Sequence, residues 1–476
     1  MKNQKNLKNS KDPTNNCEYI YTYPIFTESM KKDYTILIPN MLPVHFKLIG
    51  KIMNNYGYNV ELLETVGRQI ADAGLKSVHN DTCYPALLVI GQFIDAIESG
   101  KYDKNKIALM ITQTGGGCRA SNYIHLLRKA LDIRGYGYIP VLSLNFSGLD
   151  KKASFKITVP MAFQLIYSIL FGDLIMLLYN QCKPYEIIQN DSENAQSESF
   201  EMCFNLFKKN KLISYKTVKN TYKNIINIFN KIERRKETKI KVGVVGEIYV
   251  KYSPLGNNNL EDFLRSVNAE VVIPGLLDFC MYCVVNSIID RNLYGGKLIK
   301  AGMYSIIYKW LLKKQSDVIS AINENSGFTP PMKFDMTVAR VKDYISHGVK
   351  MGEGWLLTAE MVELIHSGAG NIVCTQPFGC LPNHIAGKGM MRKIKEKNPE
   401  ANIVAIDYDP GATKINQENR IKLMLSVAKR NIELDSGEDT EIKYQAKDLR
   451  DLQKTAKTDK TENESVFSTA AGNTPI

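Results

Sequence analysis

This chain has few of the residues that hold small secreted proteins together. Its 476 residues include only nine cysteines and six histidines, which is too few cysteines for a fold stapled by disulfides. The first sixteen residues are polar and contain no apolar stretch of the kind found in secretion signals. We therefore expect a cytoplasmic protein whose thiols are reduced and serve metal or redox chemistry.

Signatures of nucleotide and nucleic-acid binding are also missing. Gly243 and Gly246 lie in or beside a β-rich run, without the third glycine of a dinucleotide fingerprint, and the phosphate-loop motif is absent. The net charge of +12 comes from scattered lysines. A solvated basic surface is therefore expected, with no nucleic acid bound, and an acidic partner or a phosphorylated ligand such as coenzyme A is the alternative.

One stretch, residues 157–180, is long enough to cross a membrane. It contains Pro160, Gln164 and Asp173, and an aspartate at a bilayer centre costs roughly 2.5–3.5 kcal/mol on insertion scales. We expect instead a buried helical layer, with a turn or kink at Gly172-Asp173, and no contact with a membrane.

What the chain does contain is an alternation of short β-rich runs and periodic helical stretches, which is typical of parallel sheets. The predicted fold class is α/β, with two Rossmann-like parallel-sheet domains, helical insertions, and a site in the cleft between the domains at the carboxyl ends of the strands. The expected organisation is a flexible segment 1–33, a first α/β domain 34–150, a helical connection 151–238, a second α/β domain with a helical insertion 239–430, and a polar, disordered tail 431–476.

Two cysteine-bearing turns repeat each other along the chain. One is VCTQPFGCLPNH, which contains Cys374 and Cys380, and the other is ITQTGGGCRASN, which contains Cys118. Both carry Thr-Gln, then Gly-Cys, then Asn, where an apolar run ends and a helix is expected to begin. A chain that places thiols at the same strand-to-helix turn in both halves is expected to hold a ligand there, and a metal cluster is the first candidate.

The glycine loop before Cys118 supports a cluster. Backbone N–H groups at Gly116 and Gly117, together with Arg119, are expected to face an anion, and an iron–sulfur cluster with thiolate ligands is an anion. Cys83 precedes another predicted helix, whose dipole would favour the thiolate. The alternative for Cys83 is a small buried residue beside a helix cap.

Other candidate residues have weaker support from the sequence. Cys280 and Cys283 lie in an apolar helical stretch and are expected to be core residues, with reach toward a cluster as the alternative. His79 and His384 flank the cysteine motifs and are candidate catalytic residues, as ligands, hydrogen-bond donors or proton carriers; capping roles are equally compatible. The acid of the loop Gly352-Glu353-Gly354 is read as a hydrogen-bond acceptor or a cap.

Five motifs in this order resemble one family: HNDTCYPA, TQTGGGCRASNY, GEIYVKYSPLGN, GEGWLLTAEM and CTQPFGCLPNH. From about residue 34 to 428 the chain resembles the 2-hydroxyacyl-CoA dehydratase superfamily, specifically its activase-related, double-cubane-like domain. The resemblance implies an oxygen-sensitive iron–sulfur protein with a [4Fe-4S] or double-cubane cluster between two α/β domains. By matching position it implies Cys83, Cys118, Cys374 and Cys380 as ligands.

The resemblance also implies partners. A separate ATP-dependent activase with an actin-like fold would supply a low-potential electron for radical dehydration, or reduction, of an acyl-CoA-like substrate. No activase nucleotide motif is present here, so that ATPase is expected on another chain, and the family's habit of pairing implies a possible dimer. Four cysteine ligands would occupy every iron of a cubane and favour a non-catalytic relay or assembly subunit. Three would leave an iron open for catalysis. A structural zinc protein is a further alternative.

Overall fold

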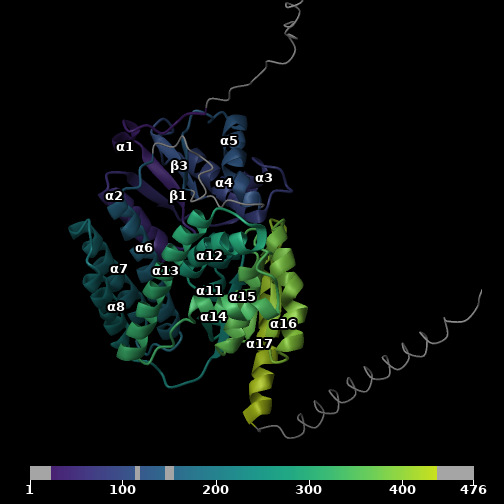
Figure 1. Ribbon diagram of the computed structural model, residues 1–476. Coiled ribbons are helices and arrows are strands. Elements are labelled where there is room, and N and C mark those ends of the chain that lie inside the picture. The colour runs from purple at the N-terminus through teal and green to yellow at the C-terminus, as the bar shows by residue number, and fades with distance from the viewer. Residues whose placement is uncertain (1–22, 113–117, 145–154, 437–476) are drawn as a thin grey trace, which may run out of the picture.

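The computed structural model of the chain describes residues 23–112, 118–144 and 155–436. It contains two four-stranded sheets in which every described strand pair is parallel. The strand orders are β2-β1-β3-β4 and β6-β5-β7-β8, so the second half of the chain repeats the topology of the first. The first sheet and its helices lie at the top of Figure 1, and the elements of the second half lie below them. The predicted fold class, two parallel-sheet units with helical insertions, is confirmed.

The first unit has its central strands buried on both faces. Its elements are α1 Met30–Asp33, β1 Thr35–Pro39, α2 Pro43–Asn55, β2 Asn59–Leu63, α3 Arg68–Leu75, α4 Tyr84–Glu98, β3 Ile107–Thr112, the 3-10 helix η1 Arg119–Asn122, α5 Tyr123–Ile133 and β4 Val141–Leu144. Every residue of β3 except Thr112 is buried, as expected for a parallel strand that helices cover on both sides. Thr112 ends the strand at the exposed carboxyl edge.

A helical layer follows, made of α6 Val159–Cys182, α7 Asp191–Lys209 and α8 Tyr215–Asn230. Among the described residues, α6 alone is long and apolar enough to cross a membrane, but 61% of its most apolar window is buried inside the protein. It packs against α2, α7 and α8, so it serves as a core helix, in line with the predicted buried layer.

The kink predicted at Gly172-Asp173 is wrong, because α6 runs through it unbroken. Gly172 is needed for a close approach: a Cβ there would lie 2.5 Å from Cδ2 of His45 on α2. The Asp173 carboxylate bonds to His45 Nε2 at 2.8 Å and accepts the backbone N–H groups of Leu276 and Leu277, at 2.8 and 2.9 Å. One acid on α6 therefore joins the first unit to a helix of the second.

The second unit begins at β5 and carries most of the helices. Its elements are β5 Ile240–Gly246, α9 Ile248–Tyr252, α10 Pro254–Asn257, α11 Leu260–Ser266, β6 Ala269–Val272, α12 Leu276–Tyr294, α13 Leu298–Asn325, α14 Phe334–Arg340, the 3-10 helix η2 Val341–Asp343, α15 Trp355–His366, β7 Asn371–Pro377, the π-helical turn η3 Asn383–Gly387, the 3-10 helix η4 Lys388–Met390, α16 Met391–Lys397, β8 Asn402–Tyr408 and α17 Lys414–Ser436. Because α17 continues to Ser436, the ordered unit extends past the predicted boundary at residue 430.

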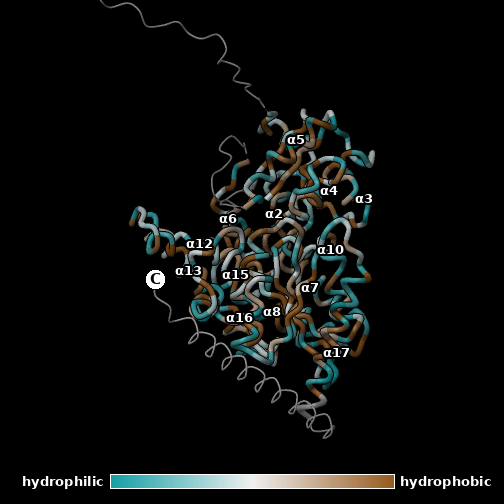
Figure 2. Tube along the Cα trace, turned by 90° about the vertical axis from the view of Figure 1, so that its right-hand side faces the viewer, coloured by the Kyte–Doolittle hydropathy of each residue, from teal (hydrophilic) through white to brown (hydrophobic). Residues whose placement is uncertain are grey.

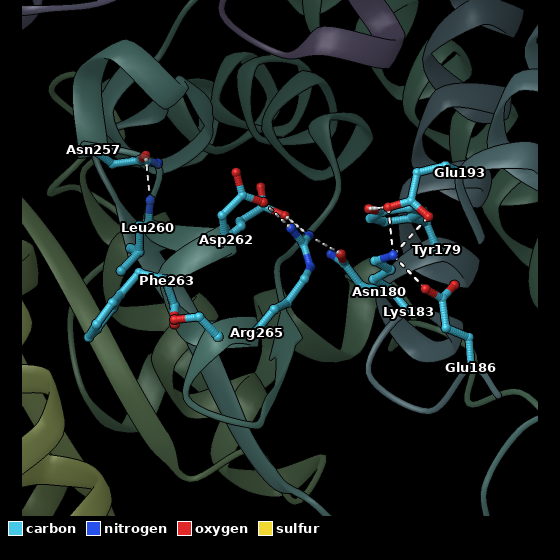
Figure 3. Close-up of polar contacts among 12 residues, drawn as sticks. Tyr179, Asn180, Lys183, Glu186, Glu193, Asn257, Leu260, Asp262, Phe263 and Arg265 are labelled. Carbon is cyan, nitrogen blue, oxygen red and sulfur yellow. Dashed lines mark hydrogen bonds and ion pairs between the residues drawn. The ribbon is translucent and has the colours of Figure 1, made fainter. Parts of the chain in front are cut away.

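Polar contacts fix the helical layer against the second unit (Figure 3). Arg265 of α11 donates to Asn180 of α6 at 2.9 Å and to Glu261 on its own helix at 2.6 Å. Within the layer, Lys183, the residue after α6, binds Glu193 of α7 at 2.8 Å. These part-buried charges are paired, as buried charges must be, and they hold the layer beside α11.

Helices α12 and α13 pack against each other as a hairpin whose turn projects from the body (Figure 2). The N-terminal end of α12 faces the space between the two sheets. There the Tyr282 hydroxyl donates to the carbonyl oxygens of Lys350 and Gly352, at 2.8 and 3.0 Å. This fully buried tyrosine positions the loop that precedes α15.

Candidate functional site

A cavity of about 510 Å³ lies where the carboxyl ends of the two sheets meet. In the first unit it is lined by the ends of β1 and β3, the start of α4 and the segment after residue 117; in the second, by the residue after β5, the loop before α15 and the turn after β7. In parallel sheets ligands bind beyond the carboxyl ends of the strands. The cavity thus occupies the place predicted for the site.

Cys83 forms one wall at the N-terminus of α4. It is 5% exposed, and its Sγ lies 3.2 Å from the Tyr123 hydroxyl oxygen. Burial raises the pKa of the Cys83 thiol, although the Tyr123 hydrogen bond opposes the change. Desolvation of the thiolate makes the largest contribution to this rise.

Cys118 forms a second wall directly after residues 113–117, so Gly116 and Gly117 lie outside the described residues. Its Sγ accepts the N–H of Ala120 at 3.5 Å, and burial raises the pKa of the thiol to about 11. Arg119 also lines the cavity, and its guanidinium donates to the carbonyl oxygen of Asp81. Arg119 therefore ties the segment that carries Cys118 to the loop that carries Cys83.

Cys380 forms a third wall, on the turn that follows β7. It is 6% exposed, and burial raises the pKa of its thiol. The turn approaches the Cys83 loop closely: the N–H of Tyr84 donates to the carbonyl oxygen of Phe378 at 3.0 Å. Gly379 has φ +72°, and a Cβ there would lie 3.1 Å from Cys83 Cα. Two cysteine loops from different units are thus hydrogen-bonded together.

Cys374 is not brought to this cavity. It lies inside β7, is fully buried, and packs in a separate apolar cluster with Val245 and Met361. Its Sγ is 3.7 Å from the side-chain oxygen of Asn383. Cys374 lies three residues before the carboxyl end of β7, and residues 372–377 are all buried, so its side chain packs inside the second unit. The structure therefore unites three of the four predicted ligands: Cys83, Cys118 and Cys380.

The other predicted residues are spread around the cavity or away from it. His384 is exposed and lines the cavity rim. His79 is exposed as well, does not line the cavity, and lies 3.4 Å from an oxygen of Asp81. On α12, Cys283 is exposed and Cys280 is partly buried, so the prediction of a core position is wrong for Cys283.

Two buried acids complete the cavity wall, and sequence reasoning gave neither a site role. Glu247 is 8% exposed and caps α9 by accepting the N–H of Val250 at 2.9 Å. Glu353 is 7% exposed and accepts the N–H of Ile248 at 3.1 Å. Burial, and then the neighbouring Glu353, raise the pKa of Glu247 to about 8; burial also raises the pKa of Glu353. The signal that could have identified them is a repeated Gly-Glu pair, Gly246-Glu247 and Gly352-Glu353.

The donor set fits a soft metal cluster. Three thiols line the cavity, and thiolates select zinc, copper(I) or iron–sulfur centres. The basic side chains among the described lining residues are Arg119 and His384. Burial raises the pKa of each thiol and of both carboxyl groups. A bound metal core would supply positive charge and lower the pKa of the thiols that ligate it.

A single metal ion fits less well than a cluster. Within the described ranges, no group of three or more His, Cys, Asp or Glu side chains is gathered closely enough to hold one ion. Zinc draws all its ligands to about 2.0–2.3 Å, whereas each iron of a cluster takes its own thiolate. Thiols on three separate walls therefore suit a multinuclear cluster better.

Neither a scan against protein-family models nor a search of curated proteins found a match for this chain.

Proposed function

We propose that this chain is an iron–sulfur protein of the 2-hydroxyacyl-CoA dehydratase type. It would accept low-potential electrons from a separate ATP-dependent activase and use them for radical dehydration, or reduction, of a small substrate in the cavity. The observation that carries the proposal is that Cys83, Cys118 and Cys380, from three loops of two α/β units, line one cavity. When bound, the cluster would supply one-electron chemistry at an iron atom.

The number of thiols favours a catalytic role over a relay. Cys83, Cys118 and Cys380 would hold three irons of a cubane and leave the fourth without a cysteine ligand, so that iron would be available to a substrate oxygen. The relay alternative requires a fourth thiol, but Cys374 is fully buried in another cluster of side chains. A cluster with an accessible iron is the arrangement that catalysis needs.

The chain's own residues would prepare the cavity for this chemistry. Ile38, Val89, Met110 and Phe279 give it apolar walls, which exclude water from a reactive radical. Glu247, with its pKa raised to about 8, holds a proton at neutral pH. It can therefore donate a hydrogen bond, or a proton, to a leaving hydroxyl group.

Iron and acid-labile sulfide per chain, measured on protein purified without oxygen, test the proposal. We expect Cys83→Ser, Cys118→Ser and Cys380→Ser each to lose most of the iron, and Cys374→Ser to keep it. Cys182→Ser is the matched control, because Cys182 is fully buried and does not line the cavity. Zinc without sulfide, or no metal in the parent protein, would exclude the function; equal loss in Cys374→Ser would favour the relay.

A further inference from the structure

The four loops that meet at the cavity are related by the repeat of the two units. In the first sheet α4 precedes β3, and Cys118 follows β3 after five residues; in the second, α15 precedes β7, and Cys380 follows β7 after two residues. β3 and β7 hold the same place in their sheets. Cys118 after β3 therefore corresponds to Cys380 after β7, and the loop before α4 corresponds to the loop before α15.

The close contacts across the cavity are also repeated, once from each unit to the other. A Cβ on Gly379, in the turn after β7, would lie 3.1 Å from Cys83 Cα in the loop before α4. A Cβ on Gly352, in the loop before α15, would lie 3.5 Å from Cys118 Sγ after β3. Each turn after a central strand thus touches the loop before the helix of the other unit.

Three of these four loop positions carry a thiol, and the fourth carries an acid. Cys83 immediately precedes α4, and Glu353 lies two residues before the first residue of α15. Glu353 is 7% exposed and lines the cavity with the three thiols. Glu353 lies one residue further from the start of its helix than Cys83 does, and its longer side chain compensates for this difference.

We propose that Glu353 is the fourth ligand of the metal cluster, an exchangeable carboxylate at the position that has no cysteine. The proposal rests on the proposed function. On binding, the carboxyl group releases its proton to solvent and offers one oxygen to the metal. A carboxylate is a harder and weaker ligand for iron than a thiolate, so it closes the site at rest and yields to a substrate oxygen.

The hydrogen bond from Ile248 supports this role as a positioning contact. The N–H of Ile248 holds one carboxylate oxygen at 3.1 Å, and Tyr282 holds the backbone of the same loop through Gly352. Ligating carboxylates are themselves commonly hydrogen-bonded. The alternative is that Glu353 only satisfies the N–H of Ile248.

Two substitutions separate these roles. Glu353→Gln keeps an oxygen acceptor for Ile248 but lacks the negative charge of a good ligand, and Glu353→Cys offers a fourth thiolate. Glu270→Gln is the matched control, since Glu270 is an equally buried carboxyl that does not line the cavity, and glutamine keeps an oxygen that can accept the Tyr185 hydroxyl. Thermal unfolding of the metal-free proteins confirms that each variant folds.

The measurement is the rate of iron release per chain under limited oxidation with ferricyanide, with Mössbauer spectra of protein loaded with ⁵⁷Fe. We expect release to be about tenfold faster in Glu353→Gln and about tenfold slower in Glu353→Cys, as for changes in or next to a metal ligand, with Glu270→Gln unchanged. One iron site should differ from the others in the parent protein and match them in Glu353→Cys.

Unchanged release in both Glu353 variants, in protein that does bind iron and sulfide, would overturn this proposal and leave the proposed function standing. A parent protein without iron would overturn both. A changed rate in Glu270→Gln equal to that in Glu353→Gln would also overturn it, because the loss of any buried carboxyl would then suffice.

Discussion

Replacement of Gly379 by alanine tests whether close contact between two cysteine loops shapes the site. Gly379 has φ +72°, and its new Cβ would lie 3.1 Å from Cys83 Cα. The left-handed backbone alone costs an alanine about 1–2 kcal/mol. The contact adds roughly 1–3 kcal/mol, as overpacking usually does, because the Cys83 backbone is tied to the same turn by the Tyr84–Phe378 hydrogen bond.

Gly368→Ala is the matched control. Gly368 has φ +83°, but no atom lies within 4 Å of the position of its Cβ, so that variant should lose only the backbone contribution. Urea unfolding of the metal-free proteins gives both free energies, and iron per chain reports the geometry. We expect Gly379→Ala to be the less stable variant and to hold less iron. Equal stability and equal iron in the two variants would refute the argument that the loops are held in contact.

Three further predictions concern buried acids. Asp173→Ala removes the acceptor for Leu276 at the start of α12 and should lower the free energy of unfolding by roughly 2–3 kcal/mol, measured by urea unfolding. Glu360→Gln leaves Lys251 without its carboxylate partner, now at 2.8 Å with both side chains buried, and should cost roughly 3–5 kcal/mol in the same assay. The metal-free protein should lose stability between about pH 4.5 and 8, because folded Glu247, with its pKa raised to about 8, keeps a proton that the unfolded chain has released. Melting temperatures across this range should fall less in Glu247→Gln, and an unchanged slope would contradict the assignment.

The architecture was predictable because its signals are local. Apolar runs such as β1 and β3 are buried strands, and parallel strands covered by helices are apolar along their length. The kink expected at Gly172-Asp173 was wrong because both residues are explained by partners distant in sequence. Gly172 makes room for His45, and Asp173 caps a helix that begins about 100 residues later. No local pattern carries that information.

The site was predictable only in part, for a geometric reason. The echo between the two cysteine turns indicated Cys118 and Cys380, which follow corresponding strands and both line the cavity. Cys374 shares the second motif but lies inside β7, where its side chain packs in the core of the second unit. Glu247 and Glu353 were given no site role because an acid next to a glycine is ordinary at a helix start. Both acids are seen to line the same cavity as the thiols only when the two units are packed together.

Charge balance links metal loading to folding in this cavity. Without metal, three thiols and two carboxyls line one cavity, and burial raises the pKa of each. These groups must therefore stay protonated for the metal-free protein to fold well. Metal binding requires deprotonated ligands and releases their protons, so its affinity rises with pH. Raising the pH thus weakens the metal-free fold and strengthens metal binding, and the stability gained on loading should be larger at pH 8 than at pH 6.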